Sequence, residues 1–353
     1  MPKFPSTYKT VALKRGIVSI VTRTFPQDVL GENTVVLKPD YIGICRADIK
    51  EIVGSRDIPT DRGPLFGHEF VGSVAFAGTR TGFQDGELVT FNPNIVPTRT
   101  TGFAEYVFVH GSEEQLAQAI VRVPEPAILD NIWMPEPFAC VVHAVQKLFE
   151  IANLTSLEGK KVGIIGAGCS GVMFAMYAKH LGASVIVLNR GEMRRNFARA
   201  RGLLAKSEVF ALTEFEAHRN SCDVVIVVPT IITPTLLENA ADMGVNGAIV
   251  HIYGGTRQGD LFPSTQLDID TVRRNEHIQS VDYQGKKLRV SGAYGCFKED
   301  YEESFRLHKQ YPDRFPLEKI VSKHITFDEI SALMMGVAAK TEDYPGKVIL
   351  KVA

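Results

Sequence analysis

Cysteine is scarce in this chain and is not arranged in pairs. The 353 residues include five cysteines, an odd number, and no two of them form a CxxC motif. This pattern argues against a disulfide framework and against a cysteine-rich zinc knuckle. We therefore expect few of these thiols to take part in chemistry.

Long apolar runs and an excess of either charge are also missing. Apolar runs such as 224–229 are too short to cross a bilayer, and residues 1–16 lack the apolar stretch of a secretory signal. The 39 lysines and arginines balance 40 aspartates and glutamates, so no strong field favours nucleic acid or an anionic membrane. We expect a cytoplasmic protein whose partner is a small molecule, with no nucleic-acid or membrane partner.

The length of 353 residues exceeds what one hydrophobic core usually supports, so two domains are expected. Up to Pro124 the sequence consists of short β-type runs separated by turn residues, which predicts a partly open β-barrel. From Lys161 onward, apolar strands alternate with helical segments, which predicts a doubly wound parallel sheet. The strands that we expect in this second part are 161–165, 184–188, 223–228 and 247–252.

The end of the sequence is expected to return to the first domain. It predicts one more helix over 298–310 and a closing strand over 346–352. The prediction is therefore an α/β protein with two domains. A β-barrel domain covers 1–152 and is completed by 298–353, and a dinucleotide-binding domain covers 153–297.

A glycine-rich turn joins strand 161–165 to the helix that follows it. In such a turn the first glycine makes the tight bend, the second lets the backbone approach a pyrophosphate, and the third lets helix and strand pack closely. The N–H groups at the helix start would bind the phosphates. We expect a nicotinamide dinucleotide here, and a turn without a ligand is the alternative. The residues are Gly166, Ala167, Gly168, Cys169, Ser170 and Gly171.

The end of the second strand bears on the choice of cofactor. NAD-specific domains carry an acidic residue there, which bonds the ribose 2′-OH. This chain has Asn189 and Arg190 instead, with Arg194 and Arg195 one turn further on. Asn189 does not repel a 2′-phosphate and Arg190 can pair with it, which predicts a preference for NADP(H) over NAD(H). Arginines that only solvate an exposed helix start are the competing interpretation.

Three short motifs carry residue types that bind catalytic zinc. Cys45 lies in a turn, His68 and Glu69 precede a predicted strand, and Glu136 stands at the head of a predicted helix. Cysteine, histidine and glutamate around one open position form catalytic zinc sites. Each motif alone also has a structural explanation: a small buried thiol, a hydrogen-bonded histidine, and an acid favoured at a helix start.

Together, in this order and ahead of a dinucleotide fold, the motifs resemble the zinc-containing medium-chain dehydrogenase/reductase family. The resemblance covers nearly the whole chain, including Ser291-Gly-Ala-Tyr-Gly295 and the closing Gly346-Lys-Val-Ile-Leu350. It implies a GroES-like catalytic domain, a Rossmann dinucleotide-binding domain, and a homo-oligomer, either a dimer or a tetramer. The implied reaction is hydride transfer between a nicotinamide and a carbon whose oxygen zinc polarises.

The resemblance also assigns roles around the metal. It implies that Cys45 and His68 are zinc ligands and that Asp48 orients the histidine. Glu69 becomes a ligand or a close neighbour of the metal. Glu136 takes the position where polyol dehydrogenases carry a glutamate beside the metal, and the two glutamates can exchange places.

For the cofactor, the resemblance implies that the backbone from Ser291 to Tyr294, with Ala293, holds the nicotinamide carboxamide. It implies that Lys347 lies near the pyrophosphate. The resemblance thus assigns the nicotinamide to backbone groups and the pyrophosphate to the ammonium group of Lys347.

Two departures from the family matter. Residues 91–105 contain no cysteine, so the structural zinc of many relatives should be absent and one catalytic zinc should remain. Ala47 stands where many relatives carry a serine or threonine of a proton relay. The proton must then leave by another route, such as Glu136 or a water.

The substrate is expected to be a polyol, sugar, sugar phosphate or cyclitol. The Glu136-Pro motif and the phrase Gly54-Ser-Arg-Asp are most similar to the sorbitol dehydrogenase and ribulose-5-phosphate reductase branch. Arg46, Arg56 and Arg62 flank the metal motifs and would suit an anionic substrate, although a solvated loop explains them equally well.

Two other classes of protein compete with this interpretation. A metal-free NADPH-dependent quinone or enoyl reductase has the same fold, but such relatives typically lack the cysteine and the His-Glu pair. A catalytically silent cofactor-binding protein would carry the same motifs, because motifs do not prove turnover.

Overall fold

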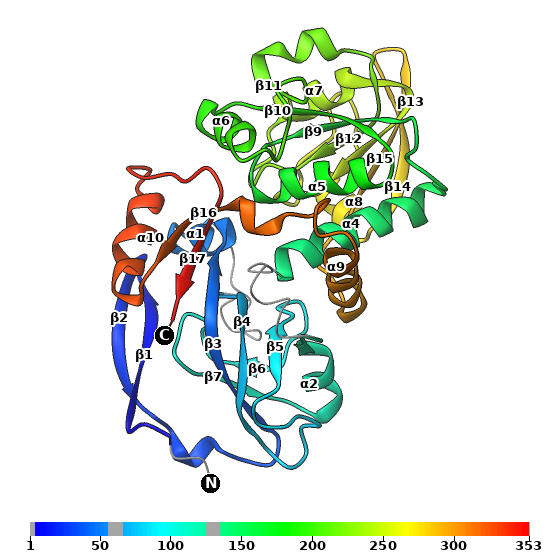
Figure 1. Ribbon diagram of the computed structural model, residues 1–353. Helices are drawn as coiled ribbons and strands as arrows, with labels where there is room; N and C mark the ends of the chain where they lie inside the picture. Colours follow the sequence, from blue (N-terminus) through cyan, green and yellow to red (C-terminus); the bar gives the residue numbers. More distant parts are fainter. Residues whose placement is uncertain (1–3, 56–65, 125–134, 353) are drawn as a thin grey trace. The chain divides into compact units, whose positions relative to one another are not determined.

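The computed structural model describes residues 4–55, 66–124 and 135–352. The chain forms two compact units, shown in Figure 1 with colours that follow the sequence. Each unit has a hydrophobic core of its own. The β unit comprises Met1–Pro137, Phe297–Lys309 and Val321–Ala353, and the α/β unit comprises Phe138–Cys296 and Gln310–Ile320.

Strand β3 (Thr34–Ile44) organises the β unit. It pairs antiparallel with β4 (Glu69–Ala77), β7 (Val107–His110) and β17 (Lys347–Lys351). The larger sheet continues from β17 to β16 (Val321–Ile325), and from β4 through β5 (Leu88–Phe91) to β8 (Ile120–Arg122). The other strands are β6 (Thr98–Arg99), which pairs with β7, and the hairpin of β1 (Thr7–Lys14) and β2 (Ile17–Thr24).

Several helical elements accompany the strands of this unit, and local capping explains where α2 begins. At the start of α2 (Glu113–Ala119), the Ser112 hydroxyl accepts from the Gln115 N–H at 3.2 Å, and the Gln115 side chain accepts from the Ser112 N–H at 3.0 Å. The other helical elements are η1 (Gln27–Val29), α1 (Arg46–Ile52), α9 (Lys298–Gln310), η4 (Phe327–Glu329) and α10 (Ile330–Ala338).

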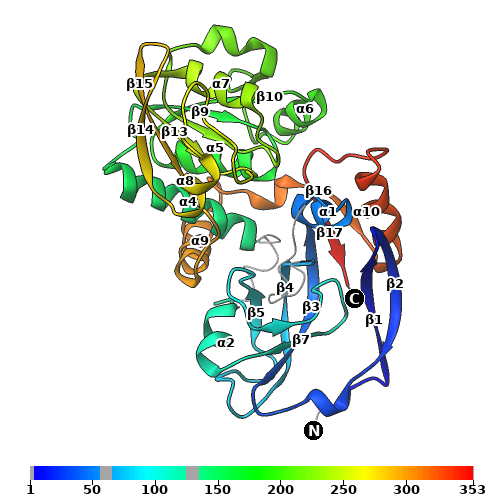
Figure 2. The same ribbon diagram turned by 180° about the vertical axis from the view of Figure 1, so that it is seen from behind.

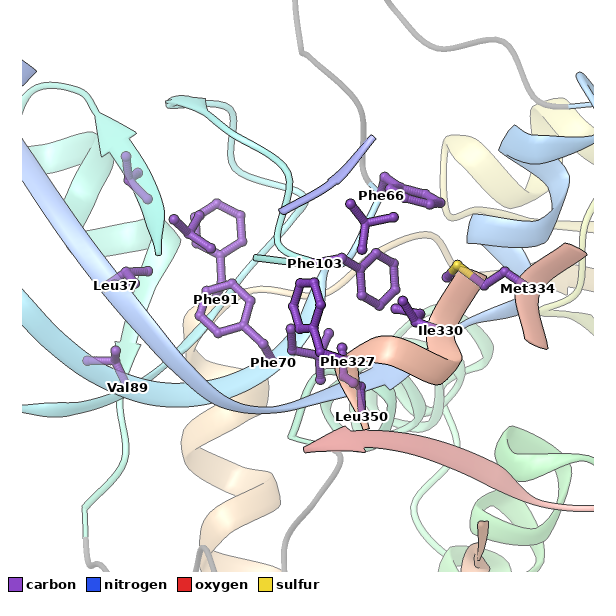
Figure 3. Packing of buried hydrophobic residues seen from close by; sticks show 14 of the residues in the cluster. Leu37, Phe66, Phe70, Val89, Phe91, Phe103, Phe327, Ile330, Met334 and Leu350 are labelled. Carbon is purple, nitrogen blue, oxygen red and sulfur yellow. The ribbon is translucent and has the colours of Figure 1, made fainter. Parts of the chain in front are cut away.

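Phenylalanines from several parts of the chain meet in the core of the β unit. Figure 3 shows Phe70, Phe91 and Phe103 converging with Phe327 and Leu350 from the C-terminal part of the chain. The rings of Phe70 and Phe91 stack with centroids 6.0 Å apart. Because residues far apart in sequence share this core, the C-terminal segment is a structural part of the β unit.

The α/β unit contains a seven-stranded sheet, seen from both sides in Figures 1 and 2. Its neighbouring strands are parallel except for the last pair, which is antiparallel. The strand order reverses beside the first strand of the unit, and ligands bind outside the carboxyl ends of strands at such a point. The order is β11 (Val209–Ala211), β10 (Ser184–Asn189), β9 (Lys161–Ile165), β12 (Cys222–Val227), β13 (Gly244–Ile252), β15 (Lys286–Gly292) and β14 (Ile278–Tyr283).

Helices follow most strands of this sheet. Helix α5 (Cys169–His180) contacts β9 and β10, and α7 (Pro234–Met243) contacts β12 and β13. The strands β9 and β12 lie inside the sheet, which explains why they consist mainly of apolar residues. The other helical elements are α4 (Pro135–Ala152), α6 (Glu192–Ala200), η2 (Leu212–His218), α8 (Ile269–Arg274) and η3 (Leu317–Ile320).

The predicted fold class is confirmed: a β unit is joined to an α/β unit with a mainly parallel sheet, and β17 returns to pair with β3. The division between the units lies at Pro137, not at residue 152 as the sequence suggested. The reason is that α4 packs with the α/β unit, for example through the Phe138 ring, which lies 5.2 Å from that of Phe315. Among the described residues, no helix is long and apolar enough to span a membrane.

We expect Phe103→Ala to destabilise the β unit by about 3–5 kcal/mol, because it leaves a cavity in the core. The Phe103 side chain is fully buried and its ring packs edge-on to Phe66 with centroids 4.9 Å apart. Urea unfolding of the purified variants measures the change. Ile17→Ala is the control, since Ile17 is 62% exposed and its loss should change the stability by less than about 0.5 kcal/mol. Equal unfolding midpoints for the two variants would contradict the assignment of this core.

Candidate functional site

Cys45 stands where β3 ends and α1 begins. It is the N-cap residue of α1, and its sulfur accepts from the Ala47 N–H at 3.4 Å. Asp48 is the third residue of the helix, and its Oδ2 accepts from the Cys45 N–H at 2.8 Å. The three-residue spacing between Cys45 and Asp48 is thus the spacing of a capping box, which fixes the conformation of the cysteine backbone.

The Asp48 carboxylate also reaches the second metal motif. Its Oδ1 accepts from the Gly67 N–H at 3.1 Å and lies 3.4 Å from His68 Nδ1. Gly67 has φ of +69°, and a Cβ there would lie 2.3 Å from the Phe103 nitrogen, so only glycine fits. Asp48 is completely buried, and its carboxylate contacts both the Cys45 motif and the His68 motif.

Three predicted ligands lie together in the β unit. His68 and Glu69 lead into β4, and the pairing of Glu69 with Gly43 brings them beside the end of β3. The possible ligand atoms of Cys45, His68 and Glu69 lie within 4.8 Å of one another. His68 and Glu69 are buried, and Cys45 is partly buried.

Glu69 has a buried partner that the sequence did not reveal. Its Oε2 accepts from Lys347 Nζ at 2.5 Å, and Lys347 also lies 3.5 Å from the Ile44 carbonyl oxygen. Gly43 leaves room for this carboxylate, since a Cβ at Gly43 would lie 2.4 Å from Glu69 Oε2. Lys347 is thus engaged inside the β unit, and its place near the pyrophosphate, which the resemblance implied, stays a prediction. The strand pairing of β17 with β3, not a local motif, creates this contact.

Neighbouring groups shift the protonation of the ligand set. Burial and the nearby Glu69 carboxylate raise the pKa of the Cys45 thiol, although a hydrogen bond with His68 acts in the opposite direction. Burial lowers the pKa of His68, but Asp48 and Cys45 outweigh it, and the pKa lies well above its ordinary value. Metal binding would displace protons from both groups, because thiolate and neutral imidazole are the coordinating forms.

The residues present fit a zinc ion. Sulfur, imidazole nitrogen and carboxylate oxygen are the usual zinc donors, and three protein ligands leave a coordination position open. Because His68 Nδ1 faces Asp48, Nε2 is the nitrogen that can face a metal. This combination of donors is typical of catalytic zinc and not of structural zinc.

The remaining residues predicted near the metal are dispersed. Glu136 is buried in the first turn of α4 and is not part of the group formed by Cys45, His68 and Glu69 within the described residues. Arg46, at the start of α1, forms an ion pair with Asp343, so its guanidinium is engaged on the protein surface. Arg56 and Arg62 lie outside the described residues.

The glycine turn after β9 has the geometry that its spacing predicted. Gly166 has φ of +111°, a conformation that glycine adopts at no steric cost. A Cβ at Gly168 would meet no atom within 4 Å, so the backbone there is open to a ligand. A Cβ at Gly171 would lie 1.8 Å from the Gly166 carbonyl oxygen, so this glycine allows helix α5 to approach the turn. Cys169 and Ser170 form the first turn of α5.

Asn189 supports this turn through its side chain. Its Oδ1 accepts from the Ala167 N–H at 3.1 Å, and its Nδ2 donates to the Gly191 carbonyl at 2.7 Å. The residue is 8% exposed. Both ends of the amide are therefore used to join the glycine turn to the segment after β10. Sequence reasoning considered only the effect of Asn189 on a 2′-phosphate.

Arg190 lines an open cavity of about 460 Å³ beside the ends of β10 and β11. Arg195 lines the same cavity, and its Nη1 donates to the carbonyls of Asn189 and Arg190 at 2.7 and 3.0 Å. Arg194 is not among the lining residues in the described part of the chain. The other residues that line the cavity are Ala211, Leu212, Thr213, Phe215, Thr235 and Asn239.

The predicted nicotinamide segment lies at the end of β15. Ser291 is completely buried, and its hydroxyl pairs with His251 Nδ1 at 2.9 Å. The Ala293 N–H donates to the Ile252 carbonyl at 3.3 Å. Burial lowers the pKa of His251 to about 3, so this imidazole is neutral. The sequence analysis did not single out His251, because its contact with Ser291 follows from the pairing of β13 with β15.

The chain is similar in sequence to known dehydrogenases. Residues 31–125 match the family model of the alcohol dehydrogenase GroES-like domain. An uncharacterized zinc-type alcohol dehydrogenase-like protein of Haemophilus influenzae is 26% identical over 203 residues, which cover 52% of this chain and 57% of that protein. Sorbitol dehydrogenase of Bombyx mori is 28% identical over 205 residues, which cover 52% of this chain and 56% of that protein. The matches thus span little more than half the length of these relatives.

The fold is similar to that of a solved dehydrogenase over almost its full length. Galactitol-1-phosphate dehydrogenase from Escherichia coli superposes with a TM-score of 0.74 at 20% sequence identity. The superposition covers 98% of this chain and 100% of that chain. At this identity the likeness concerns the fold. The GroES-like domain, the zinc-type relatives and the two-unit fold agree with one another. Together they support the zinc-containing medium-chain dehydrogenase/reductase family for this chain.

Proposed function

We propose that this protein is a zinc-dependent oxidoreductase that transfers hydride between NADP(H) and a secondary alcohol or ketone. The proposed substrate is a polyol, sugar, sugar phosphate or cyclitol. One observation carries the proposal: the ligand atoms of Cys45, His68 and Glu69 lie within 4.8 Å of one another. When bound there, zinc supplies a Lewis acid that polarises an alcohol or carbonyl oxygen.

The surrounding residues would prepare this set for a metal. The Asp48 carboxylate lies 3.4 Å from His68 Nδ1. It fixes the orientation of the imidazole ring and makes the ring a more basic ligand for a metal. The Lys347 ammonium holds Glu69 at 2.5 Å and offsets its charge. We propose that Glu69 is the carboxylate of the ligand set in this arrangement and that Glu136 serves beside the metal.

Two alternatives make different predictions. A metal-free quinone or enoyl reductase has no use for a cysteine, a histidine and a glutamate around one point, so the ligand set favours zinc over this class. A catalytically silent cofactor-binding protein would share both sites and differ only in turnover.

We expect the protein to hold about one zinc per chain, at Cys45, His68 and Glu69, because the cysteine lobe that holds the structural zinc of many relatives is missing. Cys45→Ala and His68→Ala should each lose the metal and retain the fold of the α/β unit. Elemental analysis of gently purified protein measures the content. Cys222→Ala is the matched control, because this buried cysteine lies in the core of the α/β unit and should not affect zinc. Two tightly held zincs, or none, would contradict the proposal.

We expect NADPH oxidation with at least one member of a panel of ketoses, ketose phosphates and cyclitol ketones. The activity should disappear after zinc is removed by a chelator and return when zinc is added back, because the metal polarises the substrate oxygen. Loss of NADPH absorbance follows the reaction. Activity that survives complete zinc removal would support the metal-free reductase. NADPH binding without oxidation of any panel member would support the silent protein.

The cofactor proposal rests on the cavity beside Arg190. An arginine that lines an open cavity at the end of the second strand is placed to pair with a 2′-phosphate. Asn189 is neutral, and its side chain is used within the protein, so it adds no repulsion. Arg195 holds the backbone of both residues, which limits the positions that the Arg190 side chain can take.

We expect Arg190→Gln to weaken NADPH binding and to leave NADH binding nearly unchanged. A charge-assisted hydrogen bond contributes about 1.5–3 kcal/mol, which corresponds to roughly ten- to a hundredfold in affinity. Fluorescence titration with each cofactor measures the ratio. Arg201→Gln is the matched control, since Arg201 ends α6 and stacks on Phe197. Tighter binding of NADH than of NADPH by the unmodified protein would show that the cofactor choice is wrong.

A further inference from the structure

A hydrogen-bonded histidine–glutamate pair of the α/β unit has no part in the site described so far. His143, on α4, is 4% exposed, and its Nε2 lies 2.6 Å from Glu276 Oε1. The Lys147 ammonium, one turn along the same helix, lies 3.8 Å from Glu276 Oε2. The Glu276 side chain is 18% exposed. Against the effect of burial, the hydrogen bonds from His143 and Tyr294 hold the pKa of Glu276 below its ordinary value. The carboxylate is therefore charged and held from α4.

The same carboxylate reaches the end of β15. Glu276 Oε1 accepts from the Tyr294 N–H at 2.9 Å. Tyr294 follows Ser291 and Ala293 in the segment proposed to hold the nicotinamide carboxamide through its backbone. A single carboxylate oxygen thus joins helix α4 to that segment. The contact is long-range in the fold, because the segment lies 18 residues after Glu276 in the chain.

Glu276 lies directly after helix α8, at a position where many helices end with a left-handed residue. Its φ is +49°, and the N–H of the next residue, His277, donates to the Val272 carbonyl at 3.3 Å, which closes the helix as in a Schellman motif. Glycine adopts this conformation most readily, so the backbone at this position can accept a substitution that removes the carboxylate.

The Tyr294 ring is held as well. The guanidinium groups of Arg273 and Arg274 lie 4.8 and 5.1 Å from the centre of the ring. Arg273 Nε donates to the Tyr253 carbonyl at 3.1 Å, which connects the ends of β13 and β15. The segment is thus fixed through its backbone by Glu276 and through its ring by the two arginines.

We propose that Glu276 is a positioning residue for the nicotinamide. It holds the backbone of Ala293 and Tyr294 in place, and this backbone in turn holds the nicotinamide. The inference rests on the proposed function, because it requires a nicotinamide at this segment. His143 and Lys147 hold the carboxylate, and the carboxylate fixes the backbone groups that bind the carboxamide. Loss of Glu276 should then weaken the hold on the nicotinamide half of the cofactor and leave the adenosine half unaffected.

The test compares NADPH with 2′-phospho-ADP-ribose, which lacks the nicotinamide, using calorimetric titration of the full-length protein. We expect Glu276→Gly to weaken NADPH binding by about tenfold, the value of one charge-assisted hydrogen bond, with the fragment unchanged. Glycine accepts the positive φ, so the variant should fold. Glu276→Gln keeps an acceptor for the Tyr294 N–H and should retain most of the NADPH affinity. Glu150→Gln is the control on the same helix, since Glu150 pairs with Lys147 and is 69% exposed.

The outcomes separate the two proposals. A selective loss for NADPH in Glu276→Gly, with rescue by Glu276→Gln, supports the positioning role. Equal loss for both ligands, or no loss for either, overturns it while leaving the proposed function intact. Unmodified protein that binds neither these ligands nor the pair NADH and ADP-ribose overturns the proposed function and this inference with it.

Discussion

The buried Asp48 carboxylate is the interaction on which the arrangement of the β unit's site depends. A carboxylate removed from water is destabilising unless hydrogen bonds and opposite charge compensate it. Asp48 receives the N–H groups of Cys45 and Gly67 and faces His68 Nδ1. It therefore fixes the start of α1, the turn before β4 and the orientation of the imidazole at once. Without Asp48, the contacts that hold the Cys45 motif and the His68 motif in position relative to each other would be lost.

The C-terminal strand contributes charge to the same place. The Glu69 carboxylate places negative charge in a buried position, and the Lys347 ammonium compensates it. The contact exists because β17 pairs with β3, and because Gly43 leaves space for the Glu69 carboxylate. The return of the chain to the first unit thus places a cation beside one of the candidate metal ligands.

The α/β unit uses buried polar side chains to hold backbone segments at the carboxyl ends of its strands. Asn189 joins the glycine turn to the segment after β10, and Glu276 joins α4 to the segment after β15. Backbone groups can bind a dinucleotide selectively only when they are held in place, since each freely moving segment would lose entropy on binding. Both side chains are part of the support of the proposed cofactor site.

The sequence by itself determined the features that depend on local spacing. Parallel strands buried on both faces require continuous apolar runs, so β9, β12 and β13 could be predicted from composition alone. Each of the three glycines in the turn after β9 is required for its own local steric reason. The spacing of the motif was sufficient to predict these requirements. The capping relation between Cys45 and Asp48 is equally local, because it spans one helical turn.

Contacts between distant segments were decided by the tertiary structure. Lys347 meets Glu69 across 278 positions, and His143 meets Glu276 across 133, so neither pair leaves a signal at short spacing. The boundary between the units followed the packing of α4 and not the change in composition. Arg195, and not Arg194, joins Arg190 at the cavity, because the direction of each side chain depends on how α6 lies against the sheet. Such pairs form only when the complete fold forms. The free energy that brings them together comes from burying apolar surface of several segments at once, which no single segment can do.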